Sequence, residues 1–213
     1  SLRKIYETDY AFYYNFSDDD LSFMYRRLGY RLMFCRDTFI YHTPGTAMTD
    51  EAYALDLQEG RDIFQRKYFG IDPWVDTRFD LLLRDRCFAV VLEREAYRIL
   101  GIDVRCGADL LHFKNGLRAL GKESVTLSSF VQEAKYWVDL QTICDGEVFC
   151  RPVCDLAEAL QGRTYEYIIL GEPLSSYGDP QGLLEIMRDH LCIGGRMAGR
   201  LEKGGEVFVL ERQ

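Results

Sequence analysis

Residues 98–111 read Arg-Ile-Leu-Gly-Ile-Asp-Val-Arg-Cys-Gly-Ala-Asp-Leu-Leu and give the strongest fold signal in the chain. The segment begins as an apolar, strand-like run, passes through a short turn that contains Gly107, and continues from Asp109 at helical spacing. A buried strand that leads directly into a helix is typical of a β–α–β unit, in which a helix connects two parallel strands. This segment therefore predicts the first strand and first helix of an α/β domain.

Strand-like and helix-like segments continue to alternate from this point toward the C-terminus, and a short hairpin ends the series. Strands separated by helix-length segments predict a mostly parallel sheet that is covered by helices on both faces. We therefore predict a Rossmann-like α/β domain over residues 84–213, separate from residues 1–83. The expected strands are 97–104, 124–128, 147–151, 165–171, 196–201 and 206–211, and the expected helices are 109–120, 129–137, 156–160 and 181–191.

Three parts of this domain resemble class I S-adenosylmethionine methyltransferases. Residues 98–111 resemble the first strand and cofactor loop of that family, and residues 165–174 resemble its fourth strand. Residues 191–195, Leu-Cys-Ile-Gly-Gly, resemble the turn before its fifth strand. The resemblance implies a methyltransferase-type sheet and S-adenosylmethionine as cofactor, with Asp103 and Gly107 in the cofactor loop.

The cofactor loop departs from the family pattern, which is an acid followed by three alternating glycines. Asp103 supplies the acid and Gly107 the middle glycine, but Arg105 and Asp109 stand where the other two glycines are expected. Glycines in such a loop let the backbone approach the ligand closely. We therefore expect Arg105 and Asp109 to put bulk and charge in the place of the cofactor's amino-acid moiety.

The acid that the family places after its second strand, where it holds the ribose hydroxyls, is also missing. Ser128 and Ser129 stand there, and Glu133 follows several residues later. We predict a domain that has kept the methyltransferase fold and lost the cofactor, and that serves as a docking module, for instance toward a protein partner. The alternative is a domain that still methylates a sugar with S-adenosylmethionine.

The first 83 residues are organised differently. The acidic run from Ser17 to Asp20 precedes apolar residues at helical spacing that end at Gly29, and a second helix is expected from Asp50 to Gly70. Residues between these helices, 30–42, predict two short strands or one bent strand. The acidic run has two explanations: a capping box at the helix start, or a carboxylate that is held there as a general base.

The order of elements in this part resembles the C-terminal part of bacterial-type family 2 glycosyltransferases. The matching elements are the acidic run, the Gly-Tyr pair at 29–30, His42, and the Phe-x-x-Lys-x-x-Gly pattern of residues 64–70. The resemblance implies a small α+β piece of an A-type glycosyltransferase fold and inverting transfer from a nucleotide sugar to a glycan or other acceptor. Asp18 or Asp19 would be the general base, and a divalent cation (Mg or Mn) near His42 would hold the diphosphate.

Two residues depart from this family's pattern. Ser17 stands where the family often has Glu, and Met24 stands where it commonly has Arg. The nucleotide-binding half of such an enzyme, with its own Asp-x-Asp motif, would lie before residue 1. We therefore expect this chain alone to transfer no sugar, and a third hypothesis is a non-catalytic interaction module whose aspartates only cap a helix.

Charge and hydropathy restrict the partners. A net charge of -8 argues against nucleic-acid binding, which requires a basic face. No apolar run approaches the roughly 20 residues that span a bilayer, so we expect a cytoplasmic chain without a transmembrane segment.

The number of cysteines is odd, at seven, and most lie in apolar runs. This usage predicts buried, reduced thiols. A zinc site from Cys144, Cys150 and Cys154 is the alternative.

Overall fold

The computed structural model describes residues 16–33, 35, 37–41 and 49–213. The chain divides into two units, Ser1–Val75 and Asp76–Gln213. Among the described residues, none of the helices combines the length and apolar character that a membrane crossing requires.

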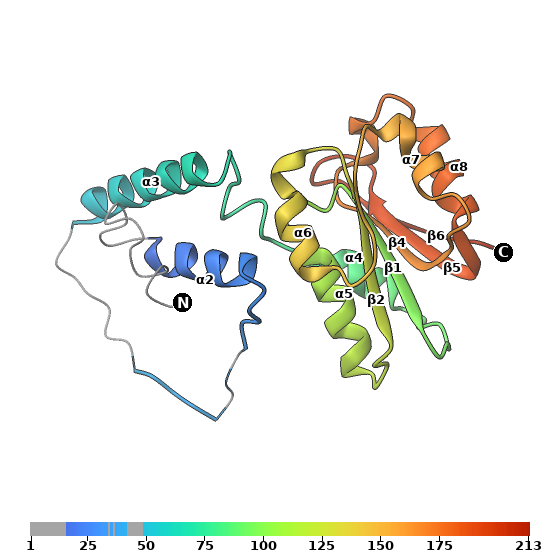
Figure 1. Cartoon of the computed structure of the whole chain (residues 1–213), viewed down its shortest axis with the longest axis horizontal. Helices are drawn as coiled ribbons and strands as arrows, with labels where there is room; N and C mark the ends of the chain where they lie inside the picture. Colours follow the sequence, from blue (N-terminus) through green and yellow to red (C-terminus); the bar gives the residue numbers. More distant parts are fainter. Residues whose placement is uncertain (1–15, 34, 36, 42–48) are drawn as a thin grey trace. The chain divides into compact units, whose positions relative to one another are not determined.

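A six-stranded sheet organises the unit Asp76–Gln213, with the strand order β3-β2-β1-β4-β5-β6 (Figure 1). Every neighbouring pair is parallel except β5 and β6, which form an antiparallel hairpin. The predicted fold class, a Rossmann-like and mostly parallel α/β sheet of methyltransferase type, is confirmed. The strands are β1 (Tyr97–Ile102), β2 (Val125–Val131), β3 (Val148–Cys150), β4 (Tyr165–Leu170), β5 (Leu191–Arg200) and β6 (Val207–Glu211).

Helices cover both faces of this sheet, as the alternation in the sequence predicts (Figure 1). The helices α4, α5 and α6 lie on one face, and α7 and α8 lie on the other. Short 3-10 turns, η1 (Ala134–Tyr136), η2 (Val153–Asp155) and η3 (Leu174–Ser176), follow the carboxyl ends of β2, β3 and β4. The helices are α4 (Leu81–Cys87), α5 (Ala108–Ala119), α6 (Trp137–Ile143), α7 (Leu156–Ala159) and α8 (Pro180–Asp189).

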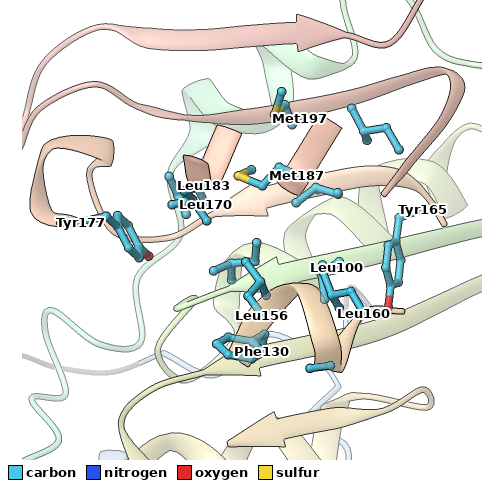
Figure 2. Close-up of a cluster of buried hydrophobic side chains, with 14 of the residues drawn as sticks. Leu100, Phe130, Leu156, Leu160, Tyr165, Leu170, Tyr177, Leu183, Met187 and Met197 are labelled. Carbon is cyan, nitrogen blue, oxygen red and sulfur yellow. The ribbon is translucent and has the colours of Figure 1, made fainter. Parts of the chain in front are cut away.

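The core on the α7 and α8 face buries one side of the central strands. Leu100 of β1, Phe130 of β2 and Leu170 of β4 meet Leu183 and Met187 of α8 in one buried cluster (Figure 2). All six residues of β4 are buried, since β4 lies in the middle of the sheet and has helices on both sides. Such two-sided burial is typical of parallel sheets.

The expected helix at 129–137 is wrong over its first half. Strand β2 continues through Val131, and α6 begins only at Trp137. The two polar residues Ser128 and Ser129 interrupt the apolar run in the sequence, but the Ser129 hydroxyl donates to the main-chain oxygen of Gly101 at 3.1 Å. A buried polar side chain with a main-chain partner is compatible with a central strand.

Two further segments differ from the expectation. In the described part of 30–42 there is no strand, and Phe39 is 87% exposed. A strand needs a partner for its main-chain groups, and no strand of the described chain pairs with this segment. The region around the expected boundary forms an unpredicted helix instead: α4 begins after Asp80, whose carboxylate accepts a hydrogen bond from the amide of Leu82 at 3.0 Å.

The unit Ser1–Val75 contains two predicted helices, α2 (Ser17–Arg27) and α3 (Asp50–Lys67). They pack through aromatic rings: the Phe23 centroid lies 5.2 Å from that of Phe64 and 4.6 Å from that of Tyr68. The expected capping box is wrong. Ser17 is already the first helical residue, and Phe16, at φ 68°, precedes it without a side-chain cap.

Candidate functional site

The carboxyl ends of β1, β2 and β4 surround a small cavity. Ligands of open parallel sheets bind at this edge, outside the carboxyl ends of the strands. The cavity has a volume of about 100 Å³, whereas pockets for cofactor-sized ligands are usually about 300–1,000 Å³. Its lining residues are Asp103, Gln132, Glu133, Tyr136, Glu172, Ser176 and Tyr177.

Asp103 follows β1 directly and is satisfied by its own chain. Its carboxylate accepts hydrogen bonds from the main-chain and side-chain nitrogens of Gln132, at 2.9 and 2.8 Å, and from the Tyr177 hydroxyl at 2.8 Å. Burial and then the charge of Asp103 raise the pKa of Tyr177, so the phenol stays a donor. Asp103, the acid predicted to contact the cofactor, is thus only 7% exposed and already accepts three hydrogen bonds from the protein.

Arg105 connects the loop after β1 to the residue that follows β4. Its Nε lies 2.8 Å from a carboxylate oxygen of Glu172 and 3.8 Å from one of Asp76. Burial lowers the pKa of Arg105, but the hydrogen bond and the charge of Glu172 outweigh burial, and the net shift is upward. Arg105 therefore stays charged and holds Glu172 at the wall of the cavity.

Asp109 is directed into the fold, where it joins the start of α5 to the start of α4. Its carboxylate accepts a hydrogen bond from the main-chain nitrogen of Asp80 at 2.7 Å. Burial, followed by the charge of Asp80, raises its pKa to about 6. The residue lies outside the set that lines the cavity.

Gly107, at φ 81°, precedes α5, and the helix α6 lies directly against it. A Cβ at this position would come within 2.1 Å of Ile143 Cδ1 and 3.1 Å of Leu140 Cδ2, both in α6. The glycine is therefore required by its backbone angle and by the neighbouring helix. On the side to which a Cβ would point, Gly107 is covered by these apolar side chains of α6.

Gly171, directly after β4, packs against the main chain of the loop that follows β1. A Cβ there would lie 2.4 Å from the main-chain oxygen of Asp103 and 2.6 Å from Cα of Val104. Because the neighbouring atoms are main chain, they cannot move aside as a flexible side chain would. The ends of β1 and β4 are thus in direct contact.

Glu133 was missed as a site residue in the sequence. Because β2 continues through Val131, Glu133 stands only two residues beyond the strand and lines the cavity. Its carboxylate forms an ion pair with Lys135 at 2.9 Å. The spacing from the true end of β2 is the signal that would have found it.

The three aspartates of α2 have two different environments. Asp20 is buried and accepts hydrogen bonds from the Lys67 ammonium, at 2.8 Å, and from the Tyr68 hydroxyl. Asp18 and Asp19 are exposed on the first turn. Partial burial and then the charge of Asp18 raise the pKa of Asp19. Asp18 and Asp19 are therefore accessible to solvent, whereas Asp20 joins α2 to α3.

The predicted cation ligand, His42, lies outside the described residues. Within the described ranges, no three His, Cys, Asp or Glu side chains come together as a set that could hold a metal ion. The zinc alternative therefore has no support in this part of the chain. All seven cysteines are free thiols, but only Cys87 and Cys106 are buried as predicted. Cys144 and Cys192 are half-buried, and the prediction is wrong for Cys35, Cys150 and Cys154, which are exposed.

Comparisons with known proteins agree with the fold only in a general way. No family model matches the sequence, and no curated protein is found as a relative. The plantazolicin methyltransferase BpumL in complex with SAH has a TM-score of 0.45 and 14% identity over 55% of this chain and 45% of its own. The CurJ carbon methyltransferase has a TM-score of 0.41 and 16% identity, over 52% and 30%. YjhP from E. coli has a TM-score of 0.41 and 15% identity, over 57% and 49%.

The matched part spans less than half the length of each of these three structures. At such scores and identities, the likeness carries no argument about activity. The fold assignment rests on the strand order and directions of the sheet itself.

Proposed function

We propose that residues 76–213 form a methyltransferase-type domain that binds no S-adenosylmethionine and acts as a non-catalytic accessory module. The observation that carries this proposal is that the protein's own side chains fill the loop after β1. Asp103 is bound by Gln132 and Tyr177, Arg105 by Glu172, and Gly107 lies under α6. The residues present do not fit the cofactor that the sequence resemblance implies.

We attribute the exclusion of S-adenosylmethionine from this cavity to lack of space more than to electrostatics. The side chains of Arg105 and Glu172 are 30% and 36% exposed, so their ion pair contributes at most about 1 kcal/mol. Micromolar binding corresponds to about 8 kcal/mol, and such a ligand would separate the pair easily. The small size of the cavity, about 100 Å³, is the larger obstacle.

Titration calorimetry of the whole chain with S-adenosylmethionine and S-adenosylhomocysteine tests this proposal. We expect no heat of binding and no thermal stabilisation, although a true ligand at a hundredfold excess over its Kd would stabilise the fold by about 2.7 kcal/mol. An active class I methyltransferase in the same buffer is the positive control. Micromolar binding to this chain would overturn the proposal.

Such binding would select the second candidate, a methyltransferase that acts on a sugar. The observation that favours this candidate is Glu133, an acid after the second strand that lines the same cavity as Asp103. Glu133→Gln would then weaken binding of the nucleoside, since a ribose hydroxyl would lose a charged acceptor.

For the unit Ser1–Val75 we propose the acceptor-side end of a nucleotide-sugar-dependent glycosyltransferase. The support is the separation of the acidic run into the buried Asp20 and the accessible Asp18 and Asp19. The raised pKa of Asp19 suits a general base, which must accept a proton during the reaction. The nucleotide sugar, the glycan acceptor, the divalent cation and the role of His42 as its ligand belong to this proposal.

Sugar transfer is to be measured on the chain extended by whatever sequence its gene encodes before residue 1, with Mn present. Asp18→Asn or Asp19→Asn should lower turnover at least about 100-fold without changing the melting temperature. Asp20→Asn is the matched control, because it should lower the melting temperature instead. Unchanged turnover in both Asp18→Asn and Asp19→Asn would remove the general-base assignment.

A further inference from the structure

The outer edge of β6 has no strand beside it in the part of the chain that the structure describes. β6 ends the strand order, and among the described residues it pairs only with β5. An exposed edge presents free main-chain donors and acceptors to any strand that fits, and proteins usually protect it with short strands, Pro or charge. The other edge strand, β3, is protected in this way: it has three residues and is followed by Arg151 and Pro152.

β6 lacks this protection. Its five residues read Val-Phe-Val-Leu-Glu, without Pro, Lys or a bulge. Its one charged side chain, Glu211, is turned back to Arg196 of the neighbouring strand at 2.9 Å. Leu210 is 43% exposed although it lies in the sheet.

The hydrogen bonds to β5 show which main-chain groups of β6 point outward. The carbonyl of Glu206 accepts from Leu201, and Arg212 bonds to the β5 segment through both its amide and its carbonyl. Successive residues of an antiparallel strand direct these groups to opposite sides. The groups of Val207, Val209 and Glu211 therefore point away from β5.

We propose that β6 pairs with β6 of a second copy of this chain, antiparallel about a two-fold axis at Val209. This register places Val209 opposite the partner's Val209 and Val207 opposite the partner's Glu211. The three outward-directed residues of each copy then exchange main-chain hydrogen bonds. The result is one sheet that runs continuously through both copies.

Three of the four kinds of facing pair in this register are complementary, and the fourth places Val207 opposite the partner's Glu211. Glu206 lies opposite the partner's Arg212, and Phe208 lies opposite the partner's Leu210. Opposite charges and apolar pairs that face each other across strands stabilise a sheet. Nη1 of Arg212 donates to the carbonyls of Asp189 and Leu191, and the other donors of the guanidinium can reach a carboxylate. A strand with this sequence therefore fits its own copy.

The oligomeric state of the whole chain tests the proposal. Sedimentation velocity over a dilution series should show a species of twice the 24.8 kDa of one chain that dissociates on dilution. Val209→Pro removes one outward amide and leaves the bonds to β5 in place, so it should abolish the dimer. Cys150→Pro, which lies on the opposite sheet edge, is the matched control and should leave the dimer unchanged.

Charge reversal tests the register independently of any effect of proline on folding. Glu206→Arg alone or Arg212→Glu alone should raise the dimer dissociation constant about tenfold, because the two-fold axis repeats each repulsive contact. The double reversal should restore the dimer. A chain that is monomeric at every concentration, a dimer that survives Val209→Pro, or a double reversal without rescue would each overturn the proposal.

Discussion

Replacing Asp109 by Asn should stabilise the protein at neutral pH. Asp109 is half-buried at the junction of α5 and α4, and this burial, followed by the charge of Asp80, raises the pKa of its carboxyl from 3.8 to about 6. An acid with a higher pKa in the folded state holds its proton more tightly there than in the unfolded chain. Between these two pKa values, a rise in pH therefore weakens the fold, and above pH 6 the full penalty is present.

The size of the effect follows from the pKa shift. Each pKa unit corresponds to 1.36 kcal/mol, so a shift of about two units amounts to roughly 3 kcal/mol. Asn keeps a carbonyl that can accept the 2.7 Å hydrogen bond from Asp80 and carries no charge. We expect Asp109→Asn to raise the free energy of unfolding by about 2 kcal/mol at pH 7. The gain should become much smaller as the pH falls to 4, because the wild-type carboxyl is then protonated in the folded state and partly protonated in the unfolded chain, whose pKa is near 3.8.

Urea unfolding of the wild type and of the variant between pH 4 and pH 8 measures this difference. Asp189→Asn, an exposed aspartate at the end of α8, is the control and should show no comparable pH-dependent gain. If Asp109→Asn and the wild type have the same stability at pH 7, the carboxylate is not destabilised by burial. A gain that persists unchanged at pH 4 would mean that the charge is not its source.

Three other substitutions or reactions test the packing. Gly171→Ala should destabilise the protein by about 1–3 kcal/mol, because the added Cβ would meet main-chain atoms. Thermal denaturation measures this loss. The control Gly178→Ala should match the wild type, because a Cβ there has open space around it. Asp20→Asn should cost about 1–2 kcal/mol, because it weakens two hydrogen bonds, and amide exchange in α2 should accelerate. Cys87, whose pKa is raised to about 12 by burial, should react with a maleimide only after unfolding. Exposed Cys150 should react at once. Peptide mass spectrometry shows in which order the two thiols are alkylated.

Much of the domain Asp76–Gln213 could be predicted from the sequence because its strands are buried on both faces. Such strands give uninterrupted apolar runs, and the expected and observed bounds of β4 differ by one residue. The end of β2 could not be predicted, because Ser129 is polar and its partner, the carbonyl of Gly101, belongs to another strand. Local sequence gives no sign that such a partner is present.

The same limit applies to the candidate site. Asp103 and Arg105 could be singled out from their positions after the first strand, but the groups that bind them could not. Tyr177 is 74 residues from Asp103, and Glu172 is 67 residues from Arg105. These contacts exist only after β4 has taken its place beside β1. The obstruction expected from Arg105 and Asp109 stays a prediction, and neither side chain belongs to the set that lines the cavity.

The backbone of this loop is strained at two residues that carry side chains. Asp103 and Arg105 have φ angles of 49° and 50°, in the left-handed region that favours glycine. A residue with a Cβ pays roughly 1–2 kcal/mol for this conformation. The three hydrogen bonds of Asp103 are of a size that offsets its strain, and the half-exposed ion pair of Arg105 offsets a part of its own. The loop therefore keeps the backbone of a glycine-rich turn while its side chains supply the stabilising contacts, and a ligand that displaced them would leave the strain uncompensated.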